Sequence, residues 1–92
     1  MHIDTAHKYK LRRALHLRTD GDKLLVLDAH SYTVHELNQS AAIVAQLCNG
    51  SMLCEEMVAK IVTEHNSETH AAAEIVYRGL QLLHEQGLLE SA

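Results

Sequence analysis

Hydrophobic and polar residues alternate along the first half of the chain in short runs. The run ALHLR sets two leucines against a histidine and an arginine, which is the period-two pattern of a strand with one buried face. Asp20-Gly21 is a strong turn signal after it. We therefore expect an antiparallel meander of three short strands, at residues 14–18, 24–28 and 32–37.

The spacing of hydrophobic residues changes to a helical period at Asn38. Asn38 or Ser40 can cap a helix, because a side-chain oxygen there accepts a bond from an otherwise unpaired backbone N–H. Three amphipathic stretches follow, and glycines end the first and the third. They predict helices over about 40–48, 51–65 and 67–86. Strands followed by helices indicate a small α+β domain, with a segment that resembles a helix-turn-helix.

Length and charge set the limits of this domain. The chain has 92 residues, enough for one core, and its aromatic residues are three tyrosines. Residues 1–12 are rich in lysine and arginine, and we interpret them as a basic, flexible arm before a domain at 13–92. The net charge is −4, and nearly all charge after Asp28 is acidic, which argues against a nucleic-acid partner. No apolar run is long enough for a membrane span, so we expect a cytoplasmic protein.

Motifs for catalysis or metal binding are not evident. The eight histidines lack the i, i+3 or i+4 spacing of a helical metal site, and we interpret them as surface residues. Cys48 and Cys54 have no CxxC spacing, and we expect reduced, partly buried thiols. We therefore predict a protein that is not an enzyme and that has no metal or cofactor.

DNA binding through the helix-turn-helix-like segment is the first alternative. The predicted helix at 51–65 would have to enter the groove, yet its polar face carries Glu55, Glu56 and Glu64 against the single Lys60. Phosphates would be repelled by this face. A DNA-binding transcriptional regulator is kept as the alternative function.

Several short motifs resemble the PqqD-like family, the recognition elements for precursor peptides of ribosomally made, modified peptides. They are VLD in the second strand, LNQSAAIVAQLCNG where the third strand passes into the first helix, Glu55 and Glu56 early in the second helix, and LQLLHEQGLLE at the end. The resemblance extends from about Leu25 to Leu89. It implies a small winged helix-turn-helix-like fold.

This resemblance also implies a function. Family members bind the leader of a precursor peptide and present the rest to a modifying enzyme, which for PqqD itself is a radical S-adenosylmethionine enzyme. The leader lies as an added strand beside the third strand, next to the third helix. The expected partners are therefore a leader peptide and a modifying enzyme, without nucleic acid or membrane.

The predicted binding residues lie at the edge of the expected sheet. If the strands lie in the order 1-2-3, the third strand has unpaired backbone groups that an extended peptide can satisfy by β-augmentation. Its side chains form two alternating sets, and the sequence leaves open which of them faces the peptide. The two sets are Thr33, His35 and Leu37, and Tyr32, Val34 and Glu36.

The third helix supplies the other predicted contacts. Ile75, Gly79 and Leu82 share one flank, with Arg78 adjacent. Gly79 costs roughly 1 kcal/mol relative to alanine inside a helix, so its presence predicts close approach by a peptide or by another core element. A homodimer that pairs edge to edge through the third strand is a further alternative.

Overall fold

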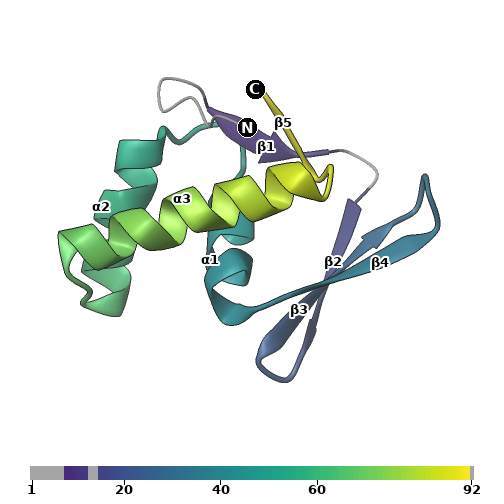
Figure 1. Cartoon of the computed structure of the whole chain (residues 1–92), viewed down its shortest axis with the longest axis horizontal. Coiled ribbons are helices and arrows are strands. Elements are labelled where there is room, and N and C mark those ends of the chain that lie inside the picture. Colours follow the sequence, from purple (N-terminus) through teal and green to yellow (C-terminus); the bar gives the residue numbers. More distant parts are fainter. Residues whose placement is uncertain (1–7, 13–14, 92) are drawn as a thin grey trace.

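The structure is a computed structural model, which describes residues 8–12 and 15–91 (Figure 1). The described strands and helices confirm the α+β class and the meander followed by three helices. In chain order they are β1 (Tyr9–Leu11), β2 (Leu15–Asp20), β3 (Lys23–Asp28), β4 (Thr33–Leu37), α1 (Gln39–Leu47), α2 (Cys54–His65), α3 (Thr69–Glu85) and β5 (Leu89–Ser91).

The meander forms one antiparallel sheet in the order β2-β3-β4. Asp20 pairs with Lys23 across a two-residue turn, where Gly21 takes a φ of 65° that suits glycine. Alternation decides the buried face: Leu24 and Val26 of β3 are buried, and their partners on β4 are Leu37 and His35. This face of the sheet is therefore directed toward the helices.

The expected arm needs a correction. Residues 9–11 form β1, which pairs antiparallel with β5 near the end of the chain. Leu11 N–H donates to the Cys48 carbonyl, Gly50 N–H donates to the Tyr9 carbonyl, and Arg12 N–H donates to the Leu88 carbonyl. This end of the predicted arm is thus part of the fold, while residues 1–7 lie outside the described residues. Alternation could not predict two three-residue strands whose partners are about eighty residues apart in sequence.

Side-chain caps begin two of the helices. The Asn38 side chain accepts a bond from the Ala41 amide at 2.9 Å, which confirms the predicted cap of α1. α2 begins at Cys54 rather than Ser51, because the Glu56 carboxylate accepts from the Leu53 amide at 2.8 Å and so fixes the first turn. α3 ends at Glu85, just before Gly87 with a φ of 72°.

The core lies where α3 crosses α1 and α2 (Figure 1). Packing is close at Gly79, where an added Cβ would lie 2.6 Å from Cγ2 of Val44 in α1. The largest fully buried side chains come from all parts of this assembly. They are Leu37, Met57, Ile61, Leu80, Leu83, Leu88, Val26, Val44 and Val76. The sheet extends from one side of the helices, and α2 lies at the opposite end of the molecule (Figure 1).

Candidate functional site

β4 is an edge strand in the described part of the chain, because its hydrogen-bond partner there is β3 alone. The register shows which backbone groups are open. Asp20 and Lys23 flank a two-residue turn, so they exchange both backbone bonds, and the bonding then alternates across the sheet. This alternation directs the N–H and C=O groups of Val34 and Glu36 away from β3. A second chain can therefore pair with β4 at these two residues.

The side chains of β4 point to two faces. Thr33, His35 and Leu37 lie on the side of the helices, and Val34 and Glu36 lie on the outer side, where Val34 is 61% exposed. The burial of Leu37 thus shows which of the two sets faces the helices. Glu36 is held by Lys23, with 2.8 Å between the carboxylate and Nζ.

A single side-chain contact joins β4 to the residue that follows α3. His35 Nδ1 and Gln86 Oε1 are 2.8 Å apart, which links the middle of β4 to the end of this helix. Positions 75, 79, 82 and 86 form one stripe of a helix, so the contact places Ile75 and Leu82 on the same flank. Both side chains are partly buried, with part of their surface open. Gln86 was not among the predicted site residues, although the stripe spacing includes it.

Three of the predicted site residues have other positions or contacts. Tyr32 lies before β4, in a turn with a φ of 58°, and its side chain is 93% exposed. The Leu37 side chain is fully buried in the core. Gly79 packs against Val44, so the close approach expected there comes from α1. Arg78 is exposed on α3.

A buried ion pair fixes the end of the sheet. Asp28 is 4% exposed, and its Oδ2 accepts from the Arg12 guanidinium at 2.6 Å. Its Oδ1 accepts from the backbone amides of His30 and Ser31, which shapes the turn into β4. Burial acts to raise the pKa of Asp28, but these hydrogen bonds outweigh it and lower the pKa to about 2. Asp28 is therefore a structural anion that holds β3 to the segment after β1.

Catalytic and metal chemistry find little support in the described residues. Burial, with the neighbouring Cys54, raises the pKa of the Cys48 thiol to about 12, so it is not a reactive thiolate. Within residues 8–12 and 15–91, no three His, Cys, Asp or Glu side chains lie close enough together to hold a metal ion. His2 and His7 lie outside that part. The described helices include none that is long and apolar enough to cross a membrane.

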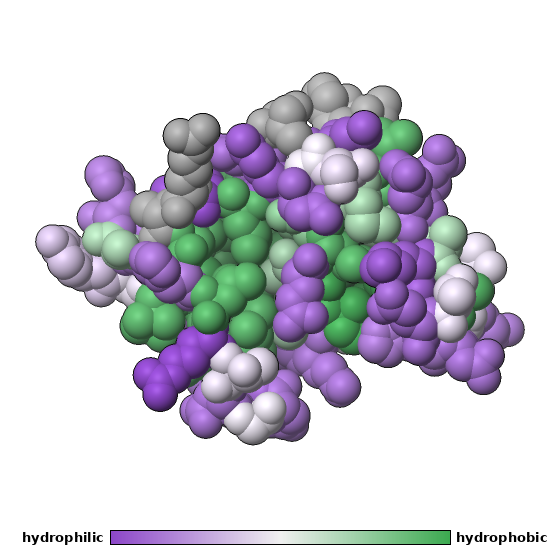
Figure 2. Space-filling view, turned by 180° about the vertical axis from the view of Figure 1, so that it is seen from behind, coloured by the Kyte–Doolittle hydropathy of each residue, from purple (hydrophilic) through white to green (hydrophobic). Residues whose placement is uncertain are grey.

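The sheet also exposes hydrophobic side chains. Leu17, Leu27 and Val34 are each more than a third exposed. Figure 2 shows hydrophobic residues gathered on the side of the molecule where the sheet lies, with hydrophilic residues around them. Exposed apolar surface of this kind is typical of binding surfaces. The open backbone groups of β4 therefore lie beside apolar surface.

Comparison with known families agrees with this geometry. The model of the family described as coenzyme PQQ synthesis protein D (PqqD) matches residues 23–89, which is most of the chain. The chain belongs to the PqqD family. No curated protein matches it at a significant level.

Two solved structures share the fold. One is described as TbiB1 in complex with the TbiA(beta) leader peptide; it is 21% identical, covers 88% of this chain and 94% of its own, and has a TM-score of 0.71. The other is described as lasso peptide synthetase B1 complexed with the leader peptide; it is 19% identical, covers 90% and 98%, and has a TM-score of 0.73. At these identities the comparison establishes a shared fold for this PqqD family member.

Proposed function

We propose that this protein captures the leader of a ribosomally made precursor peptide as a strand beside β4 and presents it to a modifying enzyme. The observation that carries the proposal is the edge itself: Val34 and Glu36 direct open backbone groups away from β3, next to the flank of α3 that reaches His35. The PqqD family match and two neighbours described as leader-peptide complexes support it.

Backbone pairing supplies the general affinity. Val34 and Glu36 each offer one donor and one acceptor, and each bond contributes about 0.5–1.5 kcal/mol net. Alternate side chains of the bound strand would point toward α3, near Ile75 and Leu82, or toward the outer face beside Val34. Selectivity then comes from these contacts, because backbone bonds do not distinguish sequences.

In this proposal the protein performs no chemical step and needs no cofactor. The reaction belongs to the modifying enzyme, which in the PqqD family can be a radical S-adenosylmethionine enzyme. Cys48 is a free cysteine buried in the core, which supports a reducing, cytoplasmic setting for the capture. DNA binding is not favoured, because Glu55, Glu56 and Glu64 make the exposed side of α2 acidic.

Proline substitution tests the added strand. Val34→Pro removes an N–H that points away from β3, so the ladder between β3 and β4 stays intact. The matched control is Leu17→Pro, which removes the corresponding outward N–H of β2. The probe is the leader of the precursor encoded beside the protein's own gene, labelled with a fluorophore.

We expect Val34→Pro to weaken leader binding by about tenfold or more, since a backbone bond is lost and the ring blocks the edge. Leu17→Pro should bind as the parent protein does. Circular dichroism verifies that both variants are folded. Equal affinity of all three folded proteins would overturn the proposed strand addition.

A further inference from the structure

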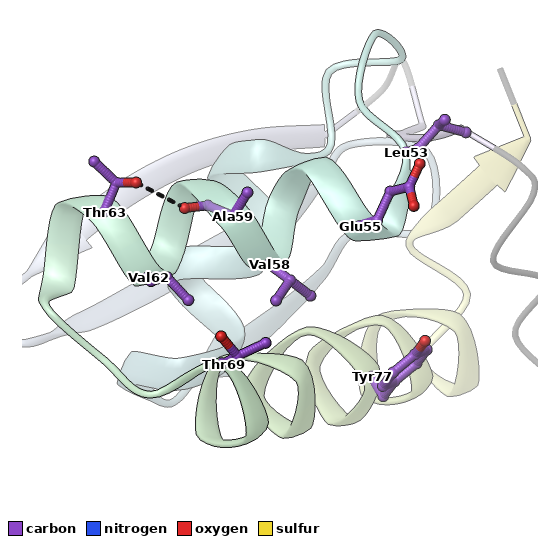
Figure 3. A pocket seen from close by; sticks show the side chains of 8 residues that line it. All are labelled: Leu53, Glu55, Val58, Ala59, Val62, Thr63, Thr69 and Tyr77. Carbon is purple, nitrogen blue, oxygen red and sulfur yellow. Dashed lines mark hydrogen bonds between the residues drawn. The ribbon is translucent and has the colours of Figure 1, made fainter.

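A second candidate surface lies between α2 and α3. It is a hollow of about 880 Å³, lined mainly by the side chains of Leu53, Val58 and Val62 from the α2 side and Thr69 and Tyr77 from α3. Figure 3 shows the valines of α2 directed toward α3 across this gap. Tyr77 is 43% exposed although it is large and mostly apolar. The hollow is thus accessible and apolar.

Its position separates it from the proposed leader site. α2 lies at one end of the molecule and the β2-β3-β4 sheet at the other (Figure 1). Tyr77 and Ile75 also differ by about 200° around α3, so opposite flanks of this helix serve the two surfaces. A peptide on β4 therefore leaves the hollow free.

The two helix segments that form the hollow, α2 and the first half of α3, are acidic in sequence. Residues 54–77 contain five carboxylates and one lysine, a net charge of −4 with the histidines neutral. That lysine, Lys60, is paired with Glu64 at 3.0 Å. Glu55 lines the hollow itself. An occupant would therefore gain from lysine or arginine residues around its apolar contacts.

We propose that the α2–α3 hollow docks a basic amphipathic helix of the modifying enzyme. Apolar side chains spaced by three and four residues would enter between Val58, Val62 and Tyr77, while flanking lysines or arginines would lie near Glu55. The proposal rests on the proposed function, since it assigns to the adaptor its second partner. It accounts for how one small domain holds peptide and enzyme at once.

Two synthetic helical peptides of 15 residues serve as probes. Both carry leucine at helical spacing; one has lysine at the remaining positions and the other has glutamate. Binding is measured by calorimetry and located by NMR of the isotope-labelled full chain. We expect the lysine peptide to bind and to shift signals of Val58, Val62 and Tyr77, and the glutamate peptide not to bind.

Three variants make the test specific. Tyr77→Ala removes the largest apolar contact and should weaken the lysine peptide about tenfold. Glu55→Lys should weaken it roughly threefold or more, whereas Glu85→Lys, the same charge change at the far end of α3, should have no effect. Leader affinity should be unchanged in all three, and leader and lysine peptide should bind together.

Three results would overturn the proposal: equal effects of Glu55→Lys and Glu85→Lys, signal shifts outside the hollow, or competition with the leader. The proposal would also be overturned if a second copy of the protein covers the hollow. In that case the molecular mass in solution would rise with protein concentration, and Tyr77→Ala would lower it. A different result would refute the proposed function alone: the lysine peptide binds at the hollow, but the leader does not bind the protein even when the lysine peptide is absent.

Discussion

β2 and β4 are the two edge strands of the three-stranded sheet in the described part of the chain. Their surroundings differ, and so would the contacts of a peptide that pairs with either of them. β2 exposes five of its six residues, and only Leu15 is partly buried. β4 runs directly into the core through Leu37, and His35 contacts Gln86, the residue that follows α3. The two strands therefore share open backbone groups but differ in what lies beside them.

This difference explains why an open edge is not by itself a binding site. A peptide paired with β2 would gain backbone bonds and at most a contact with the exposed Leu17, and isolated strand pairing is marginal in water. A peptide paired with β4 would also bury side chains against Ile75 and Leu82. Its alternate residues would then determine which sequences bind. Under the proposed function, the position of α3 beside the sheet is what would make β4 selective.

The largest expected effect comes from moving α3. Gly79→Leu places a side chain where an added Cβ would already lie 2.6 Å from Val44, so α3 must shift or the domain loses stability. We expect the free energy of unfolding to fall by about 3 kcal/mol and leader binding to weaken with it. Urea denaturation measures the first and fluorescence anisotropy the second.

The control for this variant is Ala71→Leu, at an exposed position of the same helix, which should leave both quantities nearly unchanged. If Gly79→Leu folds and binds the leader with normal affinity, the position of α3 does not affect leader binding at β4.

Removal of an apolar contact should have a smaller effect. Leu82→Ala shortens a partly exposed side chain on the same helical stripe as Gln86, and under the proposed function it should weaken the leader about fivefold. Tyr77→Ala, on the opposite flank, is the matched control and should not change leader affinity. If the tyrosine variant is the weaker binder, the leader uses the other side of α3.

Loss of the link between β4 and α3 should change affinity less again. Gln86→Ala removes the partner of His35, and a single hydrogen bond contributes about 1 kcal/mol at most in such a half-exposed site. We expect a two- to fourfold weaker leader complex, measured by calorimetry. The control is Gln81→Ala, which replaces an exposed glutamine of α3 and should bind the leader as the parent protein does. An equal loss of leader affinity in both variants would show that the His35–Gln86 contact does not contribute to binding.

Acid should lower the stability of the sheet, and only at low pH. Asp28 lies on β3, and its pKa in the folded protein, about 2, is below the usual value of 3.8. Its contribution to stability is therefore complete above about pH 4 and is lost as the pH falls toward 2. Urea denaturation between pH 6 and pH 2 should show this loss in the parent and a flatter profile in Asp28→Asn. Identical profiles would mean that the carboxylate does not stabilise the fold.

The sequence predicted the elements whose pattern is local. Alternation and the Asp20-Gly21 turn located β2, β3 and β4, and Asn38 located the start of α1. β1 and β5 were missed, because three-residue strands carry almost no pattern and depend on contacts such as the bond from Arg12 to Leu88.

The site, too, was predictable where it depends on local pattern and not where it depends on packing between distant elements. The strand edge was predictable because it depends on strand order. The sequence left open whether a peptide or another core element approaches Gly79, because its packing against Val44 is decided by how α3 crosses α1. The hollow between α2 and α3 also depends on that packing, and the helical stripe of α2 alone did not indicate it.

The most direct test of the account is amide hydrogen exchange, residue by residue, with and without the leader peptide. Bound leader should slow exchange at Val34 and Glu36, whose N–H groups point away from β3, and leave Leu15, Leu17 and Thr19 of β2 unchanged. Unchanged exchange at Val34 and Glu36 with the leader bound, or new protection on β2, would contradict it.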